Sequence, residues 1–263
     1  MTMIHDNLYW WLFCIGTFLL MALSVEVGFR IGRHQKDKVD PEQKSQVGTV
    51  LGALLALLGF LLAFSFGIAE NRFQERRMIV LKQANAIETT FLRTSFLPEP
   101  QRTEIRHLLL AYAKAFLAVI QDDSSASIKL ETENTENIQT QIWSSMEKVA
   151  TNSIQSVPLG LFIYSLNQMI DIRQERITVA IDYHLPQSLV RVLFLVSILS
   201  TLMLGFYFGL SGTRSRLVTL AMIIPFSAVL ILILDIDQTR QHLFSVTQRP
   251  MEDTLKVIES HLR

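Results

Sequence analysis

The sequence predicts an all-α membrane protein with four transmembrane helices and a helical extramembrane insert between the second and the third. Three observations predict this class. Of 263 residues, 49% are hydrophobic and only 18% are charged, against about 25% charged in a typical soluble domain. Four apolar runs are long enough to cross about 30 Å of hydrocarbon as helices. Between the second and third runs, apolar residues recur at helical spacings and not in the alternation of a strand.

The first span covers residues 8–29, LYWWLFCIGTFLLMALSVEVGF. This run is too long for a signal peptide, and residues 1–7 contain no lysine or arginine. We therefore interpret it as a retained helix and not as a cleaved leader. Glu26 lies near its end, four residues before Arg30, and this spacing favours a local ion pair on one helix face.

The second span covers residues 47–69 and contains no charged residue. From Val47 to Phe96 there is no proline, and the glycines all lie within the span. We therefore expect one unbroken helix that leaves the membrane and continues into the insert, for a total of about 75 Å. The run Leu97-Pro98-Glu99-Pro100 ends this helix, because proline disfavours helix in the residue before it.

Two stripes of side chains run along the second span. The first consists of small residues: Gly48, Gly52, Ala56, Gly59, Ala63 and Gly67. Small residues let helix backbones approach closely in lipid, so this stripe packs either within the chain or against a neighbouring subunit around an axis. The second consists of large apolar residues: Leu57, Phe60, Phe64 and Ile68. These face lipid or core or, if the helix lines a symmetry axis, form a hydrophobic constriction that gates by dewetting.

The insert is predicted to be helical throughout. Residues 103–121 form an amphipathic helix, because their apolar residues fall on one face. Residues 122–127 are predicted to be a loop, and a polar helix follows over residues 134–155. Pro158 suits the first turn of a further helix, which closes before His184-Leu185-Pro186 leads back into the membrane.

The third and fourth spans cover residues 189–210 and 217–234. Arg191 lies at the start of the third span, and Asp235 and Asp237 lie at the end of the fourth. Charges in a membrane are costly and usually have a partner, so we predict a salt bridge that joins the two spans. We also expect Pro225 to kink the fourth span.

These elements divide the chain into four parts. They are a transmembrane hairpin (1–69), a helical extramembrane domain (70–187), a second hairpin (188–236) and a C-terminal tail (237–263). Cations gather in the two short loops, which lie on one membrane face: Arg30, Arg33, Lys36, Lys38, Lys44, Arg214 and Arg216. The positive-inside rule then places the insert outside the cytoplasm. Cations just after the second span favour the opposite: Arg72, Arg76, Arg77 and Lys82. Both orientations stay open.

Composition and motifs exclude several functions. Lysine plus arginine equals aspartate plus glutamate, 24 of each, and a nucleic-acid binder needs a basic surplus. The single cysteine, Cys14, excludes an internal disulfide and a cysteine-based zinc site. The histidines are scattered, and no nucleotide-binding or hydrolase motif occurs. We therefore predict no catalytic residue, no metal site, no cofactor and no enzymatic activity.

One segment resembles a known family. Residues 52–100, GALLALLGFLLAFSFGIAENRFQERRMIVLKQANAIETTFLRTSFLPEP, are similar to the bestrophin-like family of bacterial integral membrane proteins, a family of unknown function. The segment LDIDQTRQHLFSVTQRPMEDTL (234–255) resembles that family's C-terminal part. The resemblance implies a multi-pass protein of the bacterial inner membrane.

More distantly, the chain resembles the bestrophins, which are pentameric anion channels whose second helix lines a hydrophobic neck. This resemblance implies a cytoplasmic insert, against the count of charges in the short loops. The chain departs from the bestrophins at Arg77 and Met78, where tryptophans are expected. No acidic cluster resembles the calcium-binding site of animal bestrophins.

We therefore predict a homo-oligomeric ion channel, with a pentamer favoured, the second span lining the pore and inorganic anions as the conducted ions. Its expected partners are the lipid bilayer and identical subunits. The alternative is a membrane-anchored sensor or scaffold whose helical insert binds a partner or ligand. An intramembrane enzyme or transporter is the least supported function, because neither paired catalytic groups nor an internal duplication occurs.

Overall fold

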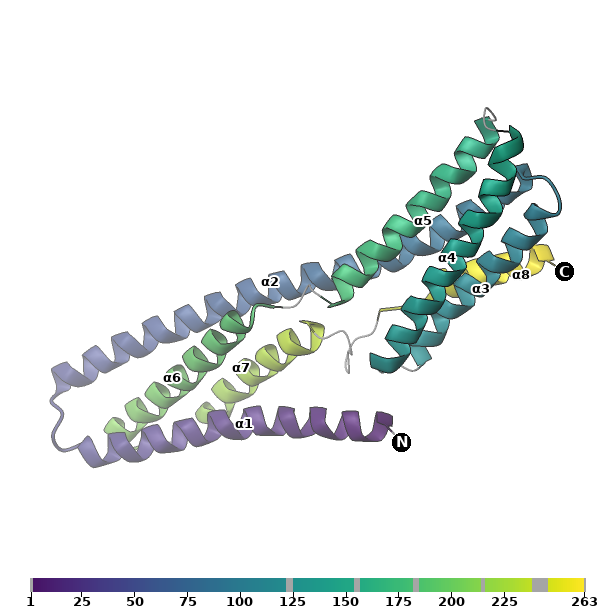
Figure 1. Ribbon diagram of the computed structural model, residues 1–263. Coiled ribbons are helices and arrows are strands. Elements are labelled where there is room, and N and C mark those ends of the chain that lie inside the picture. The colour runs from purple at the N-terminus through teal and green to yellow at the C-terminus, as the bar shows by residue number, and fades with distance from the viewer. Residues whose placement is uncertain are drawn as a thin grey trace. The chain divides into compact units, whose positions relative to one another are not determined.

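A computed structural model describes residues 2–121, 125–153, 157–181, 185–213, 216–237 and 246–262. In these ranges all regular structure is helical, as predicted, and four helices are long and apolar enough to cross a membrane. The chain divides into two compact units. Unit 1 comprises Met1–Phe73 with His184–Ser245, and unit 2 comprises Gln74–Tyr183 with Val246–Arg263. Figure 1 shows the helices in chain order.

Unit 1 holds the membrane helices. They are α1 (Thr2–Gln35), the first part of α2 (Pro41–Arg93), α6 (Gln187–Ser211) and α7 (Arg216–Asp237). The four predicted spans fall within these helices, and α1 packs against α6 and α7. Buried apolar side chains from all four make the core, among them Met21, Leu58, Leu193 and Ile233. Pro225 lies inside α7, which continues on both sides of it.

The short connections of unit 1 are tighter than predicted. Helix α1 continues to Gln35, so Arg30 and Arg33 are helical and the predicted loop over residues 30–46 shrinks to residues 36–40. Pro41 begins α2, because its fixed φ suits the first turn of a helix. Gly212 ends α6 with a φ of 70°, a left-handed conformation that glycine adopts without steric cost.

Helix α2 is unbroken from Pro41 to Arg93, as the sequence predicts. A short 3-10 helix, η1 (Thr94–Phe96), follows it, and Leu97 is extended with a ψ of 148°. The predicted stop is thus confirmed, because Pro98 disfavours a helical conformation at Leu97. The boundary between units 1 and 2, at Phe73, lies inside this continuous helix.

Unit 2 is a helical bundle. It contains the second part of α2, with α3 (Gln101–Gln121), α4 (Ser125–Ser153) and α5 (Val157–Ile181). Helices α3 and α5 agree with the prediction. Helix α4 begins at Ser125, within the predicted loop and before the predicted start at 134, because Lys129, Leu130 and Glu133 are strong helix formers. The remainder of that loop, 122–124, and residues 154–155 lie outside the described residues.

A further helix, α8 (Arg249–Leu262), belongs to unit 2 and was not predicted. It buries Met251, Thr254 and Ile258, and the Thr254 hydroxyl donates to the Ala84 carbonyl oxygen of α2 at 3.5 Å. Met251 and Ile258 thus complete a core whose largest members include Phe91, Tyr112 and Phe162.

Candidate functional site: the exposed face of helix α2

In unit 1, one face of α2 packs against the other membrane helices. Leu58, Leu62 and Ala69 are buried on this face in the core of the unit. The Ser200 hydroxyl of α6 donates to the carbonyl oxygen of Leu54 at 3.4 Å. This packed face fixes how α2 is rotated about its own axis, and therefore which side chains point away from the other helices of the chain.

The small-residue stripe lies mostly on the exposed side. Gly52, Ala56, Gly59 and Ala63 are exposed, and Gly67 is half-buried. A Cβ atom added at Gly52, Gly59 or Gly67 would meet no described atom within 4 Å. Among the glycines of this stripe, Gly48 is the one whose added Cβ would meet another described residue, with the Tyr207 ring 3.2 Å away. Most of this stripe is therefore open in a single chain, and its contact with a neighbouring subunit stays a prediction.

The large apolar stripe is also exposed. Leu57, Phe60 and Phe64 are 45%, 65% and 55% exposed, and Ile68 is half-buried. The rings of Phe60 and Phe64 stack, with centroids 6.3 Å apart and planes 13° apart. The stripe thus presents two adjacent phenyl rings, one helical turn apart, on a side of α2 that no other described helix covers.

The other membrane helices expose side chains of a different type from those of α2. They carry mostly bulky residues: Tyr9, Trp11, Phe13, Ile15, Leu19 and Leu23 on α1, Val192, Leu195 and Leu199 on α6, and Leu217, Leu220 and Ile224 on α7. Helix α1 exposes one glycine, Gly16. Bulky apolar faces suit contact with lipid, whereas small residues are enriched where helices pack on helices. Helix α2 therefore has the outward face best suited to another helix.

The closest helix contact in the membrane unit involves glycines that the sequence reasoning missed. Gly28 and Gly32 of α1 face Gly205 and Gly209 of α6, and all four are buried. A Cβ at Gly205 would overlap the Val25 carbonyl oxygen, and a Cβ at Gly28 would overlap that of Leu202. The signal was present, because each helix carries two glycines four residues apart, the pattern of close helix pairs in lipid.

Of the two ion pairs predicted for the intramembrane charges, the structure contains the local pair on α1. Arg30 Nε donates to Glu26 Oε1 at 2.9 Å, which is the local pair expected from the spacing. Arg191 is exposed and its guanidinium donates to Gln187 Oε1 at 3.4 Å. Among the described residues it forms no ion pair with Asp235 or Asp237, because it lies on the outward side of α6.

The two aspartates lie inside unit 1 at the end of α7. Asp235 is fully buried and Asp237 is 8% exposed. The carboxylate oxygens of Asp237 accept the Leu185 backbone N–H at 2.8 and 3.0 Å. Asp237 therefore holds the chain where it enters α6, a role for which the sequence pattern gave no signal.

Where α2 leaves its apolar span, the acidic residues are exposed and the first two arginines lie toward the packed side of the helix. Glu70 and Glu75 are exposed, whereas Arg72 is half-buried and Arg76 is only 6% exposed. Arg77 is exposed as well. The two arginines that follow the span most closely thus turn toward the packed side of the helix.

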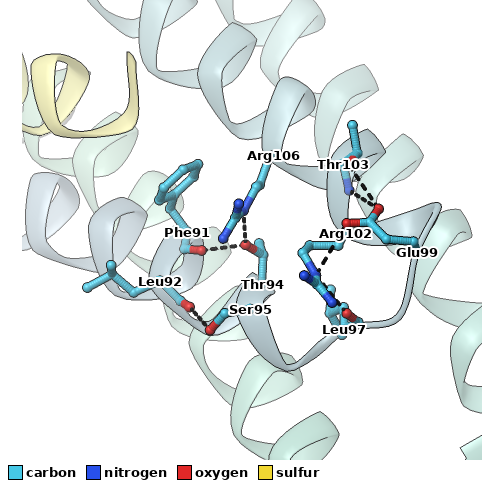
Figure 2. A network of polar contacts seen from close by, with 9 residues as sticks. All are labelled: Phe91, Leu92, Thr94, Ser95, Leu97, Glu99, Arg102, Thr103 and Arg106. Carbon is cyan, nitrogen blue, oxygen red and sulfur yellow. Dashed lines mark hydrogen bonds and ion pairs between the residues drawn. The ribbon is translucent and has the colours of Figure 1, made fainter. Parts of the chain in front are cut away.

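In unit 2, a polar network fixes the turn from α2 to α3 (Figure 2). Arg106 Nε donates to Thr94 Oγ1 at 2.8 Å, and the Thr94 hydroxyl donates to the Phe91 carbonyl oxygen at 2.6 Å. Arg102 Nε donates to the Leu97 carbonyl oxygen at 3.0 Å. The Thr94 hydroxyl thus satisfies a carbonyl group that the end of α2 leaves without a helical partner, and the two arginines of α3 bind the residues that follow α2.

Glu99 caps the start of α3 in the same turn (Figure 2). Its Oε2 accepts the Thr103 hydroxyl at 2.8 Å and the Thr103 backbone N–H at 3.3 Å. The hydrogen bond from the Thr103 side chain lowers the pKa of Glu99, because it stabilises the carboxylate form. The network thus has the features of a helix cap, and we assign it a structural role.

A second polar group lies within the bundle. The buried Tyr112 hydroxyl accepts Gln83 Nε2 at 3.2 Å and Gln139 Nε2 at 3.3 Å, so three helices meet at one oxygen. Burial raises the pKa of Tyr112, and the nearby charges of Arg176 and Arg173 oppose that rise. Within the described ranges, no group of three or more His, Cys, Asp or Glu side chains is placed to hold a metal ion.

Comparison with known proteins adds to this geometry. A family model described as a bestrophin-like domain matches residues 8–251. Among solved structures, the chain is similar to a tryptophan variant of a bacterial bestrophin homolog from Klebsiella pneumoniae, with 16% sequence identity, a TM-score of 0.67 and 95% of each chain covered. At this identity the likeness shows the fold alone. The comparison with curated proteins gives no match.

Proposed function

Because the chain belongs to the bestrophin-like family, we propose that it assembles with identical copies into an ion channel of the bacterial inner membrane whose pore is lined by α2. The observation that carries this proposal is the outward face of α2, where the exposed Gly52 and Gly59 lie on the same helix as the stacked rings of Phe60 and Phe64. The other membrane helices expose mostly bulky side chains, which are partly aromatic on α1 and aliphatic on α6 and α7. The resemblance to bestrophins favours a pentamer and implies anions as the conducted ions.

The two stripes of α2 have separate roles in this assembly. The small-residue stripe lets the backbone of a neighbouring subunit approach closely. The stripe of Leu57, Phe60, Phe64 and Ile68 faces the axis and forms a neck. A ring of such side chains blocks ions while it is dry and passes them when it widens and fills with water.

The test is reconstitution of the purified full chain in liposomes, with native mass spectrometry of the same sample. We expect an ion flux above that of empty vesicles and a mass of several chains. A monomer without flux contradicts the proposal.

Phe64→Ala tests the neck directly. Removal of the phenyl ring widens a hydrophobic constriction, so we expect a single-channel conductance higher than that of the wild type, by about twofold or more, since dewetting depends on the width and polarity of the constriction. The matched control is Leu19→Ala, which removes an exposed side chain from α1. An unchanged current in Phe64→Ala would remove Phe64 from the pore.

One observation favours the alternative function, a sensor or scaffold. Unit 2 exposes large apolar side chains outside the spans, among them Phe96 (56%) and Tyr164 (57%), and exposed apolar patches mark interaction sites. In this case the full chain in detergent carries a stoichiometric second protein and gives no flux once reconstituted. Flux without any second protein excludes this alternative.

A further inference from the structure

We propose that the short-loop face of unit 1 binds the headgroup of an anionic phospholipid, with Arg33 of α1 and Arg216 of α7 as the residues that bind its phosphate. The short-loop face consists of the end of α1, residues 36–40, the starts of α2 and α7, and the end of α6. This inference goes beyond the proposed function and does not depend on it, because one chain contains every residue of the site and lipid binding requires no conduction.

Close contacts place the end of α1 beside the end of α6. A Cβ added at Gly209 would lie 2.6 Å from the Arg33 backbone nitrogen, so Arg33 lies beside the last turn of α6. Three residues later, Lys36 crosses the residue that ends α6, because a Cβ added at Gly212 would lie 2.5 Å from Lys36 Nζ. The Lys36 ammonium therefore lies at the negative end of the α6 dipole, and Arg33 lies next to it.

A second contact brings Arg216 to the same level. The Ser227 hydroxyl of α7 donates to Met21 Sδ of α1 at 3.0 Å. Because α1 ends and α7 begins at the short-loop face, the two helices run in opposite directions. Arg216 lies 11 residues before Ser227. Gly32 lies 11 residues after Met21, and each separation spans about 16 Å along a helix. Arg216 is therefore level with Gly32, the neighbour of Arg33.

Both guanidinium groups are accessible to a ligand. Arg33 and Arg216 are exposed, and neither forms an ion pair with a residue that the structure describes. Arg30 differs, because its Nε lies 2.9 Å from Glu26 Oε1. A guanidinium group presents a planar set of donors that matches the oxygens of a phosphate. Two such groups at one membrane face suit a phosphate ligand.

The acidic residues of this face lie mainly where α2 begins. Asp37 and Asp40 belong to the connection between α1 and α2, and Glu42 lies in the first turn of α2. The helix dipole stabilises acids at that position. The described charges are Arg30, Arg33, Lys36, Lys38, Lys44 and Arg216 against Glu26, Asp37, Asp40 and Glu42. Six cations against four acids leave the face with a positive net charge, which favours a ligand with a negative one.

Exposed apolar side chains adjoin both arginines. Leu217 follows Arg216 directly and is 80% exposed. Val27 and Ile31 of α1 are also exposed, in the two turns before Arg33. A phospholipid presents a phosphate and acyl chains together, whereas a free phosphate offers nothing to these apolar side chains. Basic sites between transmembrane helices bind anionic head groups in this way, and we therefore assign the site to a lipid.

The experiment titrates the purified full chain in detergent with lipid and measures bound lipid by native mass spectrometry. Phosphatidylglycerol has a net negative charge, and phosphatidylcholine with the same acyl chains has none. At about fivefold for each Lys or Arg near the headgroups, two arginines should make phosphatidylglycerol bind about 25-fold more tightly. Arg33→Gln or Arg216→Gln should leave a preference of about fivefold, and the double variant should have none.

Two controls separate charge from folding. Arg33→Lys combined with Arg216→Lys keeps both charges and should keep most of the preference. Lys129→Gln combined with Arg249→Gln removes two exposed cations of unit 2 and should keep all of it. From 0.1 to 1 M KCl the screening length falls from about 10 Å to about 3 Å, so the wild-type preference should fall as well.

Each outcome decides the inference. Equal affinity of the wild type for the two lipids overturns it, as does a double glutamine variant that keeps the wild-type preference. Displacement of phosphatidylglycerol by inorganic phosphate at a similar concentration would show a site for a free anion and would overturn the assignment to a lipid. A chain that binds phosphatidylglycerol as expected but gives no ion flux in liposomes instead overturns the proposed function alone.

Discussion

Single glycines decide how closely α1 and α6 approach. Gly205→Ala would drive a methyl group into the Val25 carbonyl oxygen, and the backbones must separate to admit it. We expect a loss of about 1–3 kcal/mol, the usual range for overpacking, seen as a lower thermal unfolding midpoint in detergent. Gly16→Ala, on α1, is the matched control, because Gly16 is exposed and its added methyl group meets open space. Equal midpoints for the two variants would contradict this account.

The Tyr112 hydroxyl is the common acceptor of two buried amides. Tyr112→Phe leaves Gln83 and Gln139 without that acceptor, and we expect it to destabilise the chain by about 1–3 kcal/mol, measured by denaturant unfolding. Tyr164→Phe is the control, because Tyr164 is exposed and its hydroxyl only accepts from Gln168 at 2.8 Å. A Tyr112→Phe variant as stable as the control would show that this bond contributes nothing.

The same residue predicts a loss of stability at alkaline pH. Burial raises the pKa of Tyr112 in the folded chain above the value of about 10 expected when it is unfolded. Between the two pKa values the folded state holds the proton that the unfolded state releases, so stability is complete below pH of about 10 and falls as the pH rises further. Tyr112→Phe should lack this part of the alkaline loss.

Contacts within one helix could be predicted from the sequence, but contacts between helices could not. The Glu26–Arg30 pair and the stop at Leu97 depend only on local spacing and on proline. A pair between Arg191 and an aspartate of α7 depends on how two helices are rotated about their axes. Their apolar residues surround both helices, so no polar face sets that rotation in advance. The structure turns Arg191 outward and Asp237 inward.

At the scale of elements, α8 contributes to the core of unit 2. Ile258→Ala removes a fully buried side chain and should cost about 2–5 kcal/mol. We expect α8 to detach before the rest of the bundle unfolds, so hydrogen exchange should quicken in residues 249–262. Lys256→Ala, on the exposed side of the same helix, should leave exchange unchanged. Equal exchange in both variants would mean that α8 does not depend on this contact.

Some helices can be predicted from the sequence more accurately than others. Helix α2 is long, free of proline and strongly patterned, so its course could be predicted across the membrane boundary. Helix α8 has 14 residues, and helices of this length are marginal on their own. Its apolar residues are buried by contact with Ala84 and the bundle core, which lie far away in the sequence.

At the scale of the whole molecule, assembly should depend on the small-residue stripe. Gly59→Leu adds bulk where a single chain has open space, so the fold of the chain should persist while the neighbouring subunit is pushed away. We expect native mass spectrometry to show smaller species with an unchanged helical content. Leu19→Phe, a comparable enlargement on the aliphatic face of α1, should assemble normally. An oligomer of unchanged mass in Gly59→Leu would place the subunit contact elsewhere.

The position of α8 sets an order of events during biosynthesis. Residues 74–183 leave the ribosome before α6 and α7 are made, yet their core lacks Met251 and Ile258 until α8 has been translated. The newly made bundle must therefore wait, with the apolar side chains that α8 covers left exposed, while two further helices enter the bilayer. A chain that terminates shortly before residue 251 would leave those side chains exposed permanently and become a substrate for quality-control proteases.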